Sequence, residues 1–403
     1  SYTTNTVLTY IGDGDETDRN LELAGTTGGA TIDQSGTNLL TFTGEISSSA
    51  AGVKKLTLQG SKPTGAGEIA GVIADGVAGS SLTVIKAGSG TWTLSNANTF
   101  SGGITNGGGG TLVVAHPNAL GTGGVGAFNG QTSIFDLAHD GTGATVHDWR
   151  VYDTANCTIR LGRGTDGPAI THAIGTAQLS GITLHVSNGL HVTSGTPTLT
   201  IDTVDLFGGN PDKVSTLIPS EADIIIGRAA IYSGNFANKT LKLDGTSTGN
   251  MILGSISNGL NTVKLTKSNT GTWTLCGSNV FSGATSVDNG RLILAGTDGA
   301  LLGAGGITLN PSGTLVLQND PDTNHTDRLS NTGTLTLKGG TLEFAHSGGA
   351  ASYSETAGPL AVNVGSNTIF TARADEAQTS TLTFASLTRT GNGTVNFAGE
   401  GLG

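Results

Sequence analysis

The sequence predicts an all-β fold, a right-handed parallel β-helix (solenoid), which runs as a single continuous structure through residues 1–403. Three observations predict it. The chain holds 66 Gly and only 12% charged residues, which suits a thin core of small side chains. Short alternating apolar runs recur from end to end, and helical periodicity is nearly absent. A long segment of the sequence is also repeated.

The short apolar runs have the period of two that is expected of β-strands. In 91–94 (TWTL) and 333–337 (GTLTL), apolar residues alternate with Thr. Gly, Asn, Ser and Asp, which favour tight turns, separate these runs. Strands without helices leave a sandwich, a barrel, a propeller or a solenoid. Because aromatic residues make up only 5% of the chain, coils stacked in parallel suit the composition best.

The repeat has a period of about 181 residues. Residues 86–94 (KAGSGTWTL) return as 267–275 (KSNTGTWTL), and each copy is followed by a Phe-Ser-Gly sequence. We place the repeat units at about 53–125 and 238–307, with a partial third unit at 388–403; residues 126–237 are less repeat-like. The repeated positions that we single out are Trp92, Phe100, Gly102 and Leu112, and their counterparts Trp273, Phe281, Gly283 and Leu292.

These residues also carry a family resemblance. The run 92–103 (WTLSNANTFSGG), followed by 110–114 (GTLVV), resembles the passenger-associated transport repeat of autotransporters, also called the autotransporter-associated β-strand repeat. The resemblance covers 8–125 and 238–307, with part of it at 388–397. It implies a β-helical protein that is secreted or displayed on a bacterial cell surface. It supplies no catalytic residues, because the repeat is a structural motif.

The repeated aromatic residues have two interpretations. Trp92 and Trp273 could stack against sugars, but their recurrence beside the repeated glycines favours packing within the coils. The repeated cations Lys86 and Lys267, with Arg389 in the equivalent place, are interpreted as solvated or snorkelling side chains.

Charge and composition exclude several classes of partner. The net charge is −11, and the scattered Lys and Arg residues offer no clustered basic surface for nucleic acid. No apolar stretch reaches the roughly 20 residues that span a bilayer. The chain begins at Ser1 rather than Met, which we interpret as a processed or excised polypeptide. Cys157 and Cys276 are expected to be separate packed side chains, with a disulfide left open.

No cofactor is expected, although two acidic segments could hold calcium. Residues 13–18 (DGDETD) and 320–327 (DPDTNHTD) offer alternating oxygen ligands. The second segment lacks the Gly and Glu of a calcium-binding loop, so a solvated turn is the favoured interpretation.

An enzyme is not expected, since no catalytic motif appears. Were there a catalytic site, we would place it in the least repeat-like region, 136–205. That region holds the histidine and acidic residues His139, Asp140, His147, Asp148, His172, His185, His191, Asp202 and Asp205, together with Arg150.

The favoured function is structural: a subunit of an extracellular fibre, stalk or sheath at the bacterial surface. The free strand edges expected at the ends of a solenoid, with Val7, Leu8 and Tyr10 at one end and Val395 and Phe397 at the other, would stack head to tail into a homopolymer. The chain could equally be a fragment of a longer passenger.

Two alternatives remain open. An adhesin would bind glycans or surface proteins of a host or its matrix through loops at 140–170 and 318–330, where Trp149 and Tyr152 are candidate tips. A β-helical polysaccharide lyase or hydrolase is the third hypothesis.

Overall fold

The computed structural model describes residues 6–60, 65–127, 132–140, 146–151, 156–208, 212–232, 237–303, 305–321, 324–348, 352–373 and 376–399. All regular secondary structure within these residues is β-strand. None of the described segments forms a helix with the length and hydropathy that crossing a bilayer requires. Contacts within the chain divide it into two compact units, residues 1–200 and 201–403. The prediction of one continuous solenoid therefore stays a prediction, and each unit is described by itself.

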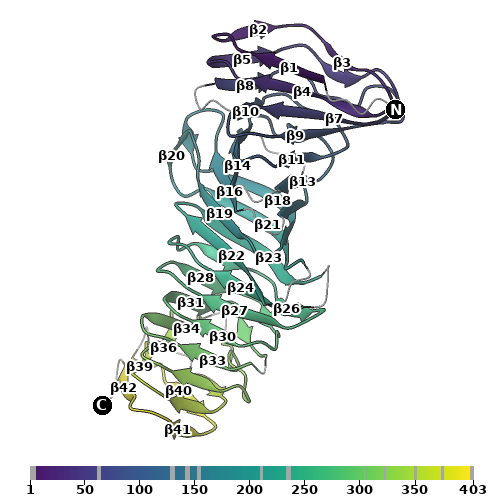
Figure 1. Ribbon diagram of the computed structural model, residues 1–403. Coiled ribbons are helices and arrows are strands. Elements are labelled where there is room, and N and C mark those ends of the chain that lie inside the picture. Colours follow the sequence, from purple (N-terminus) through teal and green to yellow (C-terminus); the bar gives the residue numbers. More distant parts are fainter. Residues whose placement is uncertain are drawn as a thin grey trace. The chain divides into compact units, whose positions relative to one another are not determined.

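In unit 1, each strand pairs in parallel with its equivalent in the next coil, and this generates two main sheets (Figure 1). One sheet contains, in order, β1 (Thr6–Tyr10), β4 (Gly28–Gln34), β7 (Gly52–Gln59), β9 (Ser80–Lys86), β11 (Ile104–Asn106), β13 (Val125–Ala127), β15 (Trp149–Val151) and β18 (Thr171–Leu179). The other contains β2 (Asp15–Thr17), β5 (Asn38–Phe42), β8 (Gly65–Ile69), β10 (Thr91–Leu94), β12 (Gly110–Val114), β14 (Ser133–Ala138), β16 (Cys157–Gly162) and β19 (Thr183–Asn188). Two short parallel pairs complete the unit, β3 (Leu21–Leu23) with β6 (Ile46–Ser48) and β17 (Gly167–Pro168) with β20 (Val192–Ser194).

Unit 2 repeats this architecture. One sheet contains β23 (Asp223–Ile231), β25 (Asn250–Ile252), β26 (Ile256–Gly259), β28 (Thr272–Leu275), β31 (Gly290–Leu294), β34 (Gly313–Asn319), β36 (Thr341–His346), β39 (Ser366–Thr371) and β42 (Thr394–Gly399). The other contains β22 (Lys213–Ser220), β24 (Lys239–Leu243), β27 (Val263–Lys267), β30 (Thr285–Val287), β33 (Ile307–Leu309), β35 (Leu335–Leu337), β38 (Leu360–Val362) and β41 (Leu387–Arg389). The short pairs are β29 (Ser278–Asn279) with β32 (Ala300–Leu301) and β37 (Tyr353–Ala357) with β40 (Ser380–Phe384). The remaining strand, β21 (Thr198–Asp205), crosses the boundary between the units.

The alternation seen in the sequence determines which side chains are buried. In β10 and β28, Trp and Leu point into the coil and are buried, while the Thr residues between them are partly exposed. Parallel register then stacks like on like, so that Trp92 lies beside Leu112 and Trp273 beside Leu292 in neighbouring coils. The all-β parallel solenoid predicted from the sequence is confirmed. Its right hand stays a prediction.

Candidate functional site

The repeat in unit 1 places three polar side chains inside the coil. Trp92 is fully buried, and its Nε1 donates a hydrogen bond to Gln59 O at 3.0 Å. The buried Asn98 amide links three coils, because its Oδ1 accepts from Ile73 N at 2.8 Å and its Nδ2 donates to Ala119 O at 2.7 Å. Side-chain bonds here replace ladder hydrogen bonds where the backbone turns.

The repeat in unit 2 makes the same bonds. Trp273 Nε1 donates to Asp244 O at 2.9 Å. Asn279 Oδ1 accepts from Ile256 N at 2.8 Å, and its Nδ2 donates to Gly277 O at 2.7 Å and to Ala300 O at 2.8 Å. Two copies of one sequence thus fold into two copies of one internal brace.

The repeated lysines are buried, so their interpretation as solvated side chains is wrong. Lys86 and Lys267 are both 0% exposed. Lys86 Nζ donates to the carbonyl oxygens of Gly88 at 2.6 Å and Gly109 at 2.9 Å. Burial lowers the pKa of each lysine to about 8. The backbone carbonyls of the turns accept hydrogen bonds from the buried ammonium groups and so compensate for their burial. The sequence pattern did not reveal these acceptors.

Lys267 makes the fuller set of bonds. Its Nζ donates to the carbonyl oxygens of Ser268 and Asn269, each at 2.7 Å, and to Asn289 at 3.0 Å. The first two carbonyls lie in the lysine's own turn and the third lies in the next coil. Arg389 differs from both lysines, since it is exposed in β41.

The remaining repeat positions pack the coil. Phe100, Leu112, Phe281 and Leu292 are all buried. At Gly102 an added Cβ would lie 2.6 Å from Leu82 O, and at Gly283 it would overlap Val263 O. These two glycines therefore allow the turn to approach the strand of the preceding coil closely.

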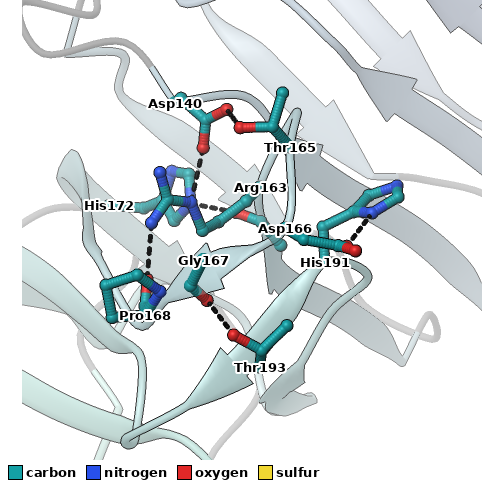
Figure 2. Close-up of polar contacts among 10 residues, drawn as sticks. Asp140, Arg163, Thr165, Asp166, Gly167, Pro168, His172, His191 and Thr193 are labelled. Atoms are coloured by element: carbon teal, nitrogen blue, oxygen red, sulfur yellow. Dashed lines mark hydrogen bonds and ion pairs between the residues drawn. The ribbon is translucent and has the colours of Figure 1, made fainter.

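A polar network on the outer surface lies in the least repeat-like region (Figure 2). Arg163 Nε contacts Asp140 Oδ1 at 2.5 Å, and Thr165 Oγ1 donates to Asp140 Oδ2 at 2.7 Å. His191 Nδ1 lies 2.7 Å from Asp166 Oδ1. These hydrogen bonds from Thr165 and Arg163 hold the pKa of the Asp140 carboxyl below its usual value.

Two histidines pack beneath this network. The His139 and His172 rings meet edge to face with centroids 4.8 Å apart, and His172 Nε2 lies 2.9 Å from Gly162 O. Burial lowers the pKa of His139 to about 4, and burial also lowers that of His172. Both imidazoles are therefore neutral at pH 7 and act as packing groups.

The other acidic candidates do not join this network. Asp205 is buried and its Oδ1 accepts from Tyr232 N at 2.9 Å, whereas Asp202 is exposed on the same strand. His147 is buried, with its Nδ1 2.9 Å from Gly123 O. Asp148 Oδ1 accepts from Thr176 N, and Arg150 and His185 lie on β15 and β19. The structure brings no two of these carboxylates together as an acid–base pair among the described residues.

The acidic segment 320–327 is followed by a buried cation, Arg328. Arg328 is buried, and its guanidinium donates to Asn319 Oδ1 at 2.8 Å, Gly299 O at 2.6 Å and Gly296 O at 3.0 Å. Glu355 accepts the backbone N–H groups of Arg328 and Leu329. Asp322 and Thr323 lie outside the described residues, and the described His, Cys, Asp and Glu residues form no group of three that could hold a metal ion.

Three further positions can be placed. Cys157 and Cys276 are free thiols. Trp149 is not a loop tip: it is buried, with its ring centroid 4.6 Å from that of Phe135. Tyr152 lies outside the described residues.

The positions named as polymer ends lie on strands β1 and β42. Val7 and Leu8 are 53% and 51% exposed, and Tyr10 is half-buried. Phe397 is 62% exposed and Val395 is half-buried.

Comparison with protein families matches the two braced segments. Residues 84–114 and 265–294 each match the sequence model of the passenger-associated transport repeat. The chain carries two passenger-associated transport repeats. The resemblance predicted from the sequence is thereby confirmed, over a narrower span than 8–125 and 238–307. No curated protein and no solved structure matches the chain significantly.

The two matched segments contain the residues that brace the coils. Lys86, Trp92 and Asn98 fall inside the first match, and their counterparts fall inside the second. Sequence reasoning did not single out Asn98 and Asn279, although one signal was present: an identical Asn stands six residues after the Trp in both copies. The repeat is typical of secreted passenger domains of autotransporters, and its presence with the β-solenoid fits such a domain.

Proposed function

We propose that this chain is a non-catalytic structural segment of a secreted passenger domain displayed at the bacterial cell surface. The proposal rests on the hydrogen bonds that the buried polar side chains of the repeats make. Among the described residues, the hydrogen bonds of Lys, Trp and Asn in both repeats go to backbone groups of their own and neighbouring coils. A catalytic site would instead direct polar groups into a cleft.

A polysaccharide panel tests the non-catalytic part of this proposal. The purified chain is incubated with acidic and neutral polysaccharides, and new reducing ends and unsaturated sugar products are measured. The proposal predicts no product above a blank without protein. Product formation that Asp202→Asn or Asp140→Asn abolishes would overturn it, since both of these carboxylates are exposed in the least repeat-like region.

We propose further that coils of separate copies stack end to end into a surface fibre or sheath. Among the described residues β1 pairs with β4 alone and β42 with β39 alone, so each strand has one free edge. A hollow of about 190 Å³ beside Leu8, lined also by Leu40 and Phe42, opens the coil interior at β1. Free parallel edges with apolar residues favour addition of another strand in the same direction.

Sedimentation and electron microscopy of the full chain test this second proposal. End-to-end stacking predicts species that grow in length as the concentration rises. The double variant Leu8→Lys/Phe397→Lys places charges on both edges and is expected to remain a single particle. Val53→Lys, which changes an exposed residue on the paired strand β7, serves as the matched control. Single particles of the unmodified chain at the highest attainable concentration would contradict the proposal and leave the non-catalytic assignment intact.

A further inference from the structure

An aspartate in unit 1 is buried on the outer face of its sheet. Phe135 and Leu137 of β14 point into the coil, so Asp136 between them points outward, yet it is only 3% exposed. The segment 189–195, which we call the strap, covers it. Gly189 N donates to Leu161 O at 3.0 Å, and Arg163 N donates to Leu190 O at 2.9 Å. These two bonds hold the beginning of the strap against β16.

Gly162 shows how closely the strap lies over the carboxylate. An added Cβ at Gly162 would lie 2.9 Å from Leu190 O and 3.3 Å from Asp136 Oδ1. The backbone of the strap and the carboxylate therefore meet at the same glycine. Any larger residue at this position would push the strap away from the sheet.

The covered carboxylate is incompletely paired. Asp136 Oδ1 has no hydrogen-bond partner, and its nearest cation is Arg160, whose Nη1 lies 4.0 Å from Oδ2 and whose side chain is 42% exposed. Burial raises the pKa of Asp136, while the charges of Arg160 and His191 lower it. An ionised carboxylate without hydrogen-bond donors is costly to bury, whereas the protonated form loses much of that cost.

The rest of the strap contains β20, which pairs with the short strand β17, but most of its residues are exposed. Gly167 N donates to His191 O at 3.0 Å, Ala169 N donates to Ser194 O at 2.7 Å, and Thr193 Oγ1 donates to Gly167 O at 3.1 Å (Figure 2). His191 has a positive φ of 64°, which is uncommon for a residue other than glycine. Leu190 is 64% exposed and contributes little burial. Segments with few buried contacts and exposed hydrogen bonds open at low free energy.

We infer that the strap is a conformational switch that closes over Asp136 when this carboxyl group is protonated and opens when it is ionised. In acid the neutral carboxyl fits beneath the strap. As the pH rises, the growing negative charge draws water to the carboxylate, and water reaches it only when the strap lifts. Opening uncovers the outer surface of β14 and β16, with Asp136 and Arg160 side by side on it.

The other charged groups around the strap act in ways that can be separated. His191, on the strap, pairs with Asp166 (Figure 2) and is one of the charged groups that act on Asp136. The Asp140–Arg163 pair stays ionised, because its hydrogen bonds hold the carboxyl pKa low. On β19 the residue beside Arg160 is the uncharged Ser187, and on β12 the residue beside Asp136 is Val113. Asp136 and His191 are thus the two groups whose effects on the strap must be distinguished.

Hydrogen exchange measured by mass spectrometry on peptides that cover 189–195 tests the switch. Protection factors, corrected for the intrinsic pH dependence of exchange, are compared between pH 4.5 and 8 in the full chain. We expect protection of the strap to fall at least about threefold with rising pH, whereas peptides from β10 and β12 keep theirs. Asp136→Asn should hold the strap at its acid level of protection across the range.

Two further variants make the result decisive. His191→Asn keeps a side chain that tolerates positive φ and removes the imidazole, so the pH dependence should persist. Gly162→Ala should leave the strap open at every pH while the control peptides stay protected. A strap whose protection does not change with pH in the unmodified chain, or an Asp136→Asn variant that keeps the full pH dependence, would overturn the inference.

Discussion

Replacing Asn279 by Ala should destabilise unit 2 more than any comparable surface change, and the magnitude follows from its bonds. The substitution leaves two buried backbone groups without partners, Ile256 N and Ala300 O, whereas Gly277 O keeps its hydrogen bond from Ala300 N. An unsatisfied buried polar group costs about 1–3 kcal/mol. Taking the low end for each group, we expect a loss of about 2 kcal/mol. Asn98→Ala likewise leaves Ile73 N and Ala119 O unpaired, so about 2 kcal/mol is expected there too.

Hydrogen exchange is the suitable assay, because a repeat protein opens locally rather than all at once. About 2 kcal/mol corresponds to a loss of protection of roughly 30-fold, and we expect it at Ile256 and in the coils on either side. Urea unfolding followed by tryptophan fluorescence provides a second measurement, since Trp273 lies in the coil next to β25.

The control is Asn396→Ala, which changes an exposed Asn on β42 and should cost less than about 0.5 kcal/mol. If Asn279→Ala changed stability no more than Asn396→Ala does, the buried amide would not brace the coils. A loss at one of these two Asn residues several-fold larger than at the other would contradict the accounting by unpaired groups.

Four other predictions rest on contacts described in the Results. Lys267→Met leaves three turn carbonyls without a donor and should cost about 3 kcal/mol of stability, and Lys86→Met should cost less. The midpoints of urea unfolding compare the two variants. Midpoints equal to that of the unmodified chain would refute the burial of these lysines. Burial lowers the pKa of both lysines to about 8, so between pH 8 and about 10.4 the unfolded chain binds more protons than the folded chain. The contribution of these lysines to the free energy of unfolding should therefore increase with pH across that window. A lysine-dependent decrease in the same titration would contradict this. Gly283→Ala places a Cβ against Val263 O and should cost about 3 kcal/mol, whereas an unchanged melting temperature would show that the turn can move aside. Burial raises the pKa of Glu355 to about 7, so between pH 4.5 and 7 the folded state binds a proton at Glu355 that the unfolded state does not. The contribution of Glu355 to the free energy of unfolding should therefore fall as the pH rises through that range. Glu355→Gln should flatten this dependence of stability on pH, and an identical dependence in the variant would contradict the prediction.

The fold could be predicted because the same alternating pattern recurs in coil after coil. In 91–94 the alternation fixes which side chains point inward, and its return at 272–275 indicates that the two copies of the repeat share one geometry. The aromatic residues could be placed for the same reason. Trp92 is an apolar residue in an inward register, whatever else its indole might bind.

The lysines show where this reasoning stops. Nothing in 86–94 reveals that the carbonyl of Gly109, more than 20 residues away, faces Lys86 Nζ. A polar side chain in a turn finds its hydrogen-bond partners in the next coil. The sequence separation between the side chain and these partners depends on how many residues the intervening coil contains. The strap could not be predicted from the sequence for a similar reason. The strand period alone places the Asp136 side chain in solvent, and only the path of residues 189–195 in the fold buries it.

The parallel stacking of coils is tested most directly by distances between spin labels on one face of unit 2. Register relates Thr272 through Arg291 and Thr314 to Thr341, and onward through Thr368 to Asn396. Labels at 272 and 341 span three coil steps, and labels at 272 and 396 span five. With about 4.8 Å for each step, we predict separations near 14 Å and 24 Å, so that the distance grows with the number of coils and not with the number of residues. Two separations that are equal, or a second one shorter than the first, would contradict the solenoid.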